Sequence, residues 1–138
     1  MSSMKATVVR RATFNAAHRL HNPAWDDAKN AEIFGLCNNP NYHGHNYTLF
    51  VHITGEIDTA TGYVMDLKEV NELIKTLVIE PFDHQNLNLD VPEFRQLIPS
   101  AENIARVIYD KFRSTLSPAY QVKIILYETE NNFVEYPA

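Results

Sequence analysis

Two histidines separated by one glycine, His43-Gly44-His45, are followed by residues 47–54, a run that has the composition of a β-strand. Side chains at positions i and i+2 of a strand point to the same face of a sheet. Both imidazoles therefore lie side by side if this segment is extended. Gly44 between them lets another backbone or a ligand come close. The motif predicts a strand that presents one edge of a metal site.

A third histidine, His18, follows the mixed apolar segment 7–14. Three neutral histidines without a nearby fourth protein ligand are typical of a catalytic zinc, where water or substrate takes the open position. His-x-His alone is a weak motif. His52 is seven residues from His45 and so falls on the opposite strand face. His21 precedes Pro23, which disfavours the helix that would let it act as a ligand beside His18.

Composition indicates one ordinary globular domain spanning residues 1–138. No apolar run approaches the ~20 residues of a membrane span, and we expect no signal peptide. The net charge is −5 with scattered Lys and Arg, which argues against nucleic-acid binding but not against a small anionic substrate. The single cysteine, Cys37, fits a reducing cytoplasm.

Hydrophobic periodicity predicts four strands and three helices. Asp66 and Ser100 are candidate helix N-caps, and Gly35 and Pro81 are candidate helix ends. The main order is β-β-α-α-β-β, which predicts an α+β fold: an antiparallel sheet with both longer helices on one face. Because the open sheet face and two edges need cover, we expect an oligomer that continues the sheet. The expected strands are residues 5–14, 43–55, 121–129 and 133–136, and the helices are residues 24–34, 66–81 and 100–112.

Cys37 lies six residues before His43, in a stretch rich in Asn and Pro that predicts a tight loop. Three readings stay open for its thiol. It is a fourth ligand that closes a structural metal site, a base that stands near the metal as thiolate, or a buried inert cysteine.

Two further sites carry candidate chemistry. Asp83 and His84 are adjacent in a loop, where an aspartate that accepts from an imidazole fixes its tautomer and raises its basicity. The alternative is a solvated loop pair. Glu128 continues the apolar strand face of residues 122–126, so its carboxylate needs a partner. A ligand with paired N–H donors, such as a 2-amino-4-oxo pyrimidine ring, fits that need, and so does a salt bridge at the sheet end.

Five segments together resemble the 6-pyruvoyltetrahydropterin synthase family, and the likeness runs nearly end to end. The resemblance implies the tunnelling fold, in which trimers close a β-barrel with helices outside and two trimers stack into a homohexamer. The segments are FNAAHRL (14–20), FGLCNNPNYHGHNY (34–47), DHQNL (83–87), SAEN (100–103) and YET (127–129).

The resemblance also implies the reaction, in which 7,8-dihydroneopterin triphosphate loses triphosphate and rearranges to 6-pyruvoyl-tetrahydropterin. No nicotinamide is needed because the redox change is internal to the substrate. The implied roles are zinc ligands His18, His43 and His45; base Cys37; proton-transfer partners Asp83 and His84; pterin anchor Glu128; and substrate-binding neighbours Ser100, Ala101 and Glu102.

Two positions depart from the family pattern. Tyr42 stands where relatives often have a small residue, and Ala101 stands where many carry a hydroxyl. Rival functions are 6-carboxy-tetrahydropterin synthase on the same fold, whose cysteine usually stands closer to His-Gly-His, and a non-catalytic zinc-binding module. The sequence leaves open which residues bind the triphosphate, and whether Thr13 after Arg10-Arg11 is a kinase target.

Overall fold

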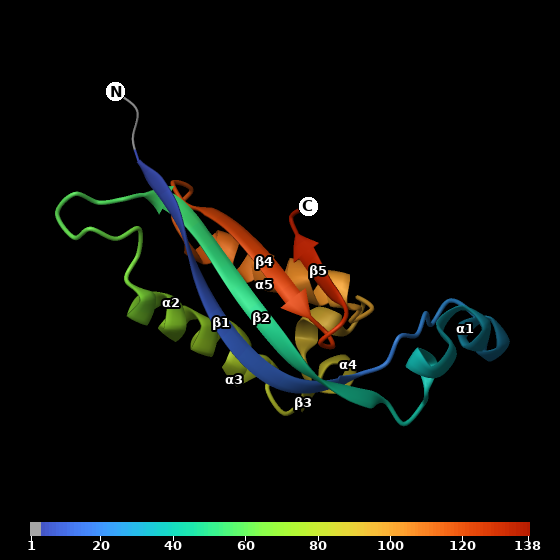
Figure 1. Cartoon of the computed structure of the whole chain (residues 1–138). Coiled ribbons are helices and arrows are strands. Elements are labelled where there is room, and N and C mark those ends of the chain that lie inside the picture. Colours follow the sequence, from blue (N-terminus) through green and yellow to red (C-terminus); the bar gives the residue numbers. More distant parts are fainter. Residues whose placement is uncertain (1–3) are drawn as a thin grey trace.

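The computed structural model describes residues 4–138 as a five-stranded sheet in the order β3-β1-β2-β4-β5, with the helices between residues 67 and 115 packed on one face and the helix of residues 27–34 beyond the end of the sheet (Figure 1). None of the helices in this part of the chain is both long and apolar enough to cross a membrane. The elements are β1 (Lys5–His18), α1 (Asp27–Phe34), β2 (His43–Glu56), α2 (Leu67–Ile74), α3 (Glu80–Phe82), β3 (Gln85–Asn86), α4 (Leu87–Asp90), α5 (Ala101–Thr115), β4 (Gln121–Tyr127) and β5 (Phe133–Tyr136).

Strands β1 and β2 form the long antiparallel ladder at the centre of the sheet, from Lys5 opposite Glu56 to His18 opposite His43. Alternate side chains of β2 are fully buried, as the period of two requires: Tyr47, Leu49, Val51 and Ile53. The predicted strand 5–14 was four residues too short, because Asn15 to His18 keep pairing with β2. The extension brings His18 into the sheet, directly beside His43.

Helices α2 and α5 cover the apolar face of the sheet, as predicted. Asp66 caps α2 by accepting a hydrogen bond from the Lys68 N–H (2.9 Å), and Ser100 caps α5 by accepting from the Asn103 N–H (3.2 Å). Each helix turns an apolar stripe inward. The stripes add Val70 and Ile74 from α2, and Ile104, Ile108 and Phe112 from α5, to the core cluster.

The expected helix end at Pro81 was wrong, since helical backbone continues through Phe82. A π-helical turn, Lys75–Ile79, precedes the proline, and the Glu80 N–H bonds back to the Lys75 carbonyl. This wider turn accommodates a residue that has no N–H to donate. Phe82 is thereby buried in the core, where it contacts Phe14 edge-on.

The N-terminal helix α1 begins at Asp27 rather than at the expected residue 24. Asp26 is its N-cap and accepts from the Lys29 N–H (2.8 Å). The preceding residues form a turn in which the Trp25 N–H bonds the Asn22 carbonyl. Gly35 ends the helix with φ of 55°, the left-handed conformation that glycine adopts without strain, as predicted.

The sheet is mixed rather than purely antiparallel. The two-residue strand β3 pairs parallel to β1 at Ala16 and Ala17, while the remaining pairs are antiparallel as expected. A strand of two residues has no periodicity to recognise in a sequence. Its effect is to hold the segment that begins with Asp83 against the outer edge of β1.

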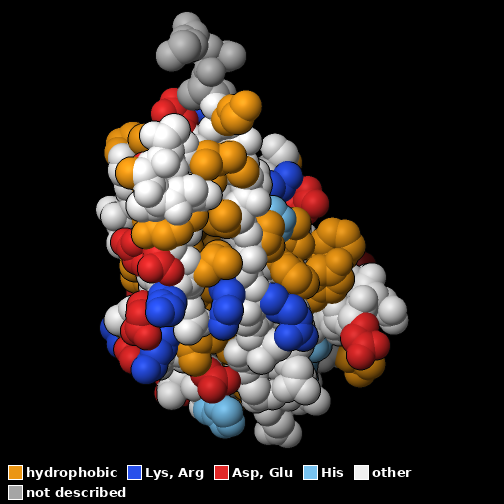
Figure 2. Space-filling view, turned by 60° about the vertical axis from the view of Figure 1, so that its left-hand side comes forward, with side chains coloured by type: hydrophobic (Ala, Val, Ile, Leu, Met, Phe, Trp, Pro, Cys, Tyr) orange, Lys and Arg blue, Asp and Glu red, His pale blue; other side chains and the backbone are white. Residues whose placement is uncertain are grey.

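The opposite face of the sheet carries no helix within residues 4–138, and α5 lies behind the sheet in Figure 1. Aromatic side chains cluster there: Tyr127 stacks on Phe133 with ring centroids 4.5 Å apart and contacts Phe50 edge-on at 5.8 Å. Figure 2 shows hydrophobic side chains interspersed with basic and acidic ones over one side of the surface. The predicted open face is present.

The Leu49→Ala substitution should lower the free energy of unfolding by about 2–5 kcal/mol, because it leaves a cavity under the central strand. Leu49 is 0% exposed, whereas Leu89 on α4 is 63% exposed. The matched control Leu89→Ala should therefore stay within about 0.5 kcal/mol of wild type in denaturant titrations. Equal effects of the two substitutions would contradict this placement of the core.

Candidate metal centre and adjoining pockets

Three imidazoles converge where β1 ends and β2 begins. His18 is the last residue of β1 and pairs with His43, the first of β2, while His45 follows two residues later on the same face. One ligand nitrogen from each ring lies within 4.8 Å of the others. The ring centroids are 4.5 to 5.0 Å apart. The set predicted from the sequence is thus brought together by the ladder.

The hydrogen bonds of His18 orient its free nitrogen toward the other two rings. Its Nδ1–H donates to the Pro99 carbonyl (2.7 Å), which leaves the lone pair on Nε2. That Nε2, the Nδ1 of His43 and the Nε2 of His45 are buried and have no hydrogen-bond partner. Buried nitrogens without partners cost free energy. Three such nitrogens facing one another fit a divalent metal that accepts imidazole ligands.

Burial also fixes the charge state of these rings. Loss of water around His18 lowers its pKa to about 4, although the bond to Pro99 acts in the opposite direction and the neighbouring histidines lower it further. The pKa of His43 is lowered as well, first by burial and then by His45. Both rings are neutral at pH 7, which is the form that coordinates a metal.

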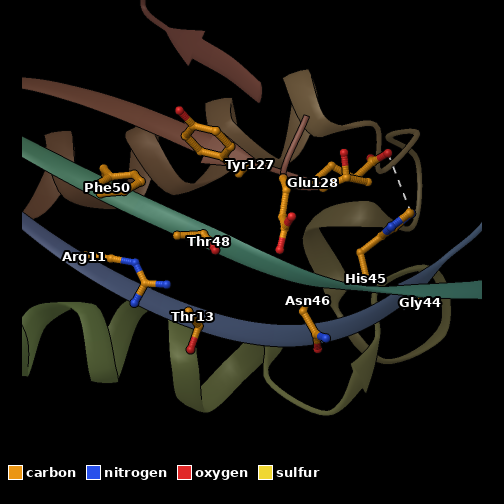
Figure 3. A pocket seen from close by; sticks show the side chains of 11 residues that line it. Arg11, Thr13, Gly44, His45, Asn46, Thr48, Phe50, Tyr127 and Glu128 are labelled. Carbon is orange, nitrogen blue, oxygen red and sulfur yellow. Dashed lines mark ion pairs between the residues drawn. The ribbon is translucent and has the colours of Figure 1, made fainter. Parts of the chain in front are cut away.

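Glu128, just after β4, brings a carboxylate to the three imidazoles. Its oxygens lie 3.9 Å from the Nε2 of His18 and 3.7 Å from the Nε2 of His45 (Figure 3). Among the described residues no Lys or Arg forms an ion pair with it, so a salt bridge to a Lys or Arg does not account for this carboxylate. Its position after the buried face of β4 agrees with the sequence prediction.

Two hollows meet at Glu128. One, about 260 Å³, is also lined by Ser100, Ala101 and Glu102, so the four expected substrate-binding residues do gather in one pocket. The other, about 660 Å³, opens on the uncovered sheet face and is drawn in Figure 3 with Arg11 and Thr13 along its lower edge. The carboxylate is therefore reachable from two sides.

Asp83 and His84 form the hydrogen-bonded pair that was one of the two alternatives predicted for this loop. The Asp83 carboxylate accepts from the Asn15 N–H (2.8 Å) and lies 2.9 Å from the His84 Nδ1. The bond from Asn15, more than the contact with His84, lowers the pKa of Asp83. The pair leaves the His84 Nε2 free on a side chain that is 81% exposed. Asn15 is three residues from His18, roughly 10 Å along β1.

Cys37 lies in a 3₁₀ turn, Gly35–Asn38, rather than in an irregular loop. Its carbonyl accepts from the Leu20 N–H (2.8 Å), which ties the turn to the segment that follows His18. The thiol is half-buried and does not belong to the group of ligand atoms formed by the described residues. The structure therefore favours neither a fourth-ligand role nor a deeply buried inert thiol.

Sequence reasoning did not identify Pro99, whose carbonyl orients His18 from 81 residues away. A backbone acceptor carries no side-chain signal, so nothing in the sequence marks this contact. The other discounted histidines behave as expected: His52 faces away from the group on β2, and His21 lies in a non-helical loop.

The sequence of this chain is similar to those of known pterin enzymes. Residues 7–138 match the family model described as 6-pyruvoyl tetrahydropterin synthase. The chain is 43% identical over 132 residues to the 6-pyruvoyl tetrahydrobiopterin synthase of Homo sapiens, covering 96% of this chain and 91% of that protein. A dihydroneopterin monophosphate aldolase of Pyrococcus furiosus is 32% identical over 130 residues, with 94% and 95% covered.

The fold agrees with these relationships. The solved Caenorhabditis elegans 6-pyruvoyl tetrahydropterin synthase superposes with a TM-score of 0.92 at 38% identity, covering 100% of this chain and 99% of that one. Fold and histidine group together define a tunnelling-fold pterin enzyme. The chain belongs to the 6-pyruvoyl tetrahydropterin synthase family.

Metal-free protein should lose stability as the pH falls from about 6.5 toward 4, because the folded state holds His18 neutral while the unfolded chain takes up a proton. Above pH 6.5 His18 is neutral in both states and does not change the free energy of unfolding. Below pH 6.5 the unfolded chain binds a proton that folded His18 does not, so the free energy of unfolding falls until the pH reaches the folded pKa of about 4. Denaturant titrations between pH 7 and 4.5 should show a shallower decline for His18→Asn. Parallel curves for wild type and His18→Asn would refute the assignment.

Proposed function

We propose that this protein catalyses the zinc-dependent conversion of 7,8-dihydroneopterin triphosphate to 6-pyruvoyl-tetrahydropterin, with elimination of triphosphate. The observation that carries the proposal is the group of three buried, unpaired imidazole nitrogens within 4.8 Å of one another, faced by the Glu128 carboxylate. The relatives named as synthases at 43% identity support the reaction.

His18, His43 and His45 would hold the zinc, since an all-nitrogen set with an open position is a common catalytic zinc site. When bound, zinc supplies a positive charge that makes the C–H beside a side-chain hydroxyl of the substrate more acidic. Pro99 keeps His18 in the tautomer that points its lone pair at the site.

Cys37 is the proposed base that removes a proton from the substrate side chain. Its thiolate takes the proton from carbon, and His84 then moves a proton between the neighbouring carbons while triphosphate leaves. The ionised Asp83 carboxylate lies 2.9 Å from the His84 Nδ1 and orients the imidazole of His84.

Glu128 is the proposed anchor of the pterin ring, because its two oxygens match the paired N–H donors of a 2-amino-4-oxo pyrimidine. The pocket that it shares with Ser100, Ala101 and Glu102 supports this role. The Ser100 hydroxyl oxygen already accepts the hydrogen bond that caps α5. The O–H donor of Ser100 and its backbone groups are left to bind the pterin ring. Ala101 offers only its backbone.

We also propose a cytoplasmic homohexamer in which neighbouring sheets join into a barrel. Apolar side chains on the uncovered face, including Val9 and Phe133, support an assembly that covers them. The free edge of β5 supports continuation of the sheet into another subunit.

Product analysis tests the reaction directly. The zinc-loaded protein is incubated with 7,8-dihydroneopterin triphosphate, and we expect 6-pyruvoyl-tetrahydropterin and triphosphate. A 6-carboxy product would indicate the queuosine-type enzyme, and cleavage to a hydroxymethyl pterin would indicate an aldolase like the 32% identical relative. The five residues between Cys37 and His43 favour the pyruvoyl product.

Cys37→Ala should keep stoichiometric zinc and reduce kcat by about 10²–10⁴-fold, since the thiolate acts on substrate and not on metal. Zinc content and steady-state kinetics are measured on the same preparation. The neighbouring exposed Leu36→Ala is the matched control and should retain both. Loss of zinc from Cys37→Ala would favour a closed structural site instead.

Glu128→Gln should weaken pterin binding by about 2–4 kcal/mol, because the amide presents a donor to a donor and loses the charge. KM should rise while zinc content stays at wild-type level. The exposed Glu130→Gln serves as control for a nearby loss of charge. Unchanged affinity for a substrate-like pterin would move the anchor to another residue, with Ser100 and Glu102 as the next candidates.

A further inference from the structure

A basic pocket of about 240 Å³ lies outside the proposed roles. It is lined by Arg19, His21, Tyr42, Asn88, Arg95 and Pro99, together with Gln96 and neighbouring apolar residues. No aspartate or glutamate lines it, although the whole chain carries a net charge of −5. Among the described residues, neither Arg19 nor Arg95 takes part in an ion pair. Two unpaired guanidinium groups in one concavity attract an anion.

Arg19 is held in place before any ligand arrives. Its Nε–H donates to the Asn38 carbonyl (2.9 Å), so both terminal NH₂ groups stay available. Asn88 holds the backbone of Arg19 on both sides: its Oδ1 accepts from the Arg19 N–H (2.8 Å) and its Nδ2 donates to the Arg19 carbonyl (3.0 Å). A pre-positioned guanidinium loses little freedom when it binds a phosphate group.

His21 adds a donor to the same pocket. The Asn38 side-chain NH₂ donates to the Leu20 carbonyl (2.8 Å) and lies 2.9 Å from the His21 Nδ1. Because a carbonyl only accepts, this Asn38 atom must be the amide nitrogen, and His21 Nδ1 must accept from it. The neutral imidazole therefore carries its proton on Nε2, where it can donate to an anion.

The pocket shares chain segments with the metal centre. Arg19 directly follows His18, and Pro99 both lines the pocket and accepts the hydrogen bond of His18. Tyr42 directly precedes His43 and has a φ of 68°, an uncommon conformation for a bulky residue. Tyr42, one of the two residues that depart from the family pattern, thus lines this basic pocket. Figure 3 draws a different pocket.

We propose that this pocket binds a polyphosphate group, with Arg19 and Arg95 as its principal anchors. The identification of that group as the triphosphate chain of the substrate rests on the proposed function. Free inorganic triphosphate, which the same reaction releases, has the same chemistry and can come from solution.

The binding test uses inorganic triphosphate and the zinc-loaded protein in isothermal titration calorimetry. Arg95→Gln should weaken binding about tenfold, and Arg19→Lys should weaken it because an ammonium group cannot form the two-pronged contact. Arg106→Gln on the exposed face of α5 is the matched control and should bind like wild type. Arg95 is exposed, so its substitution should leave the fold intact, as circular dichroism will verify.

The kinetic arm separates the two sources of the polyphosphate. If the pocket holds the substrate chain, inorganic triphosphate competes with substrate and Arg95→Gln raises KM about tenfold. Non-competitive inhibition that Arg95→Gln abolishes assigns the pocket to free triphosphate instead. Absence of binding, or equal binding by wild type, Arg95→Gln and Arg19→Lys, overturns the proposal. Triphosphate binding that depends on Arg95 in a protein without synthase activity overturns only the proposed function.

Discussion

The register of the β1–β2 ladder is the constraint on which the rest of the site depends. It pairs His18 with His43 and places His45 on the same face, the face that buries Tyr47 and Leu49. A slip of one residue would turn every side chain of one strand to the opposite face. The buried residues of the ladder resist that slip, because it would expose them to water. Core packing and metal-site geometry are therefore set by the same pairing.

The imidazoles stand where the core ends, and this position explains their electrostatics. Phe14 stacks on Tyr47 with ring centroids 4.9 Å apart, and the ring of Tyr47 lies edge-on to those of His18 and His45. This apolar support removes water from His18 and keeps its ring neutral. The Glu128 carboxylate approaches the rings from the pocket side. The site thus combines the neutral ligands His18 and His43 with a carboxylate at its mouth.

Two short segments connect the metal centre to the pockets around it. Residues 19–21 contribute Leu20 to the pocket of Glu128, and Arg19 and His21 to the basic pocket. Residues 98–102 also line both pockets: Pro99 lines the basic pocket, and Ser100 lines the pocket of Glu128. An acidic pocket and a basic one therefore adjoin the same histidine. This division of charge suits a substrate with a ring that donates hydrogen bonds and an anionic tail.

The sequence by itself determined what depends on local period and spacing. Strand parity assigned His43 and His45 to one face, placed Glu128 at the end of an apolar face and excluded His52, because alternation is a property of the chain alone. Tertiary structure decided the rest: the pairing of His18, its bond to Pro99 and the anchoring of Asp83 by Asn15. The last two contacts join backbone groups to side chains 68 and 81 residues away, and the chain carries no periodic signal for such encounters.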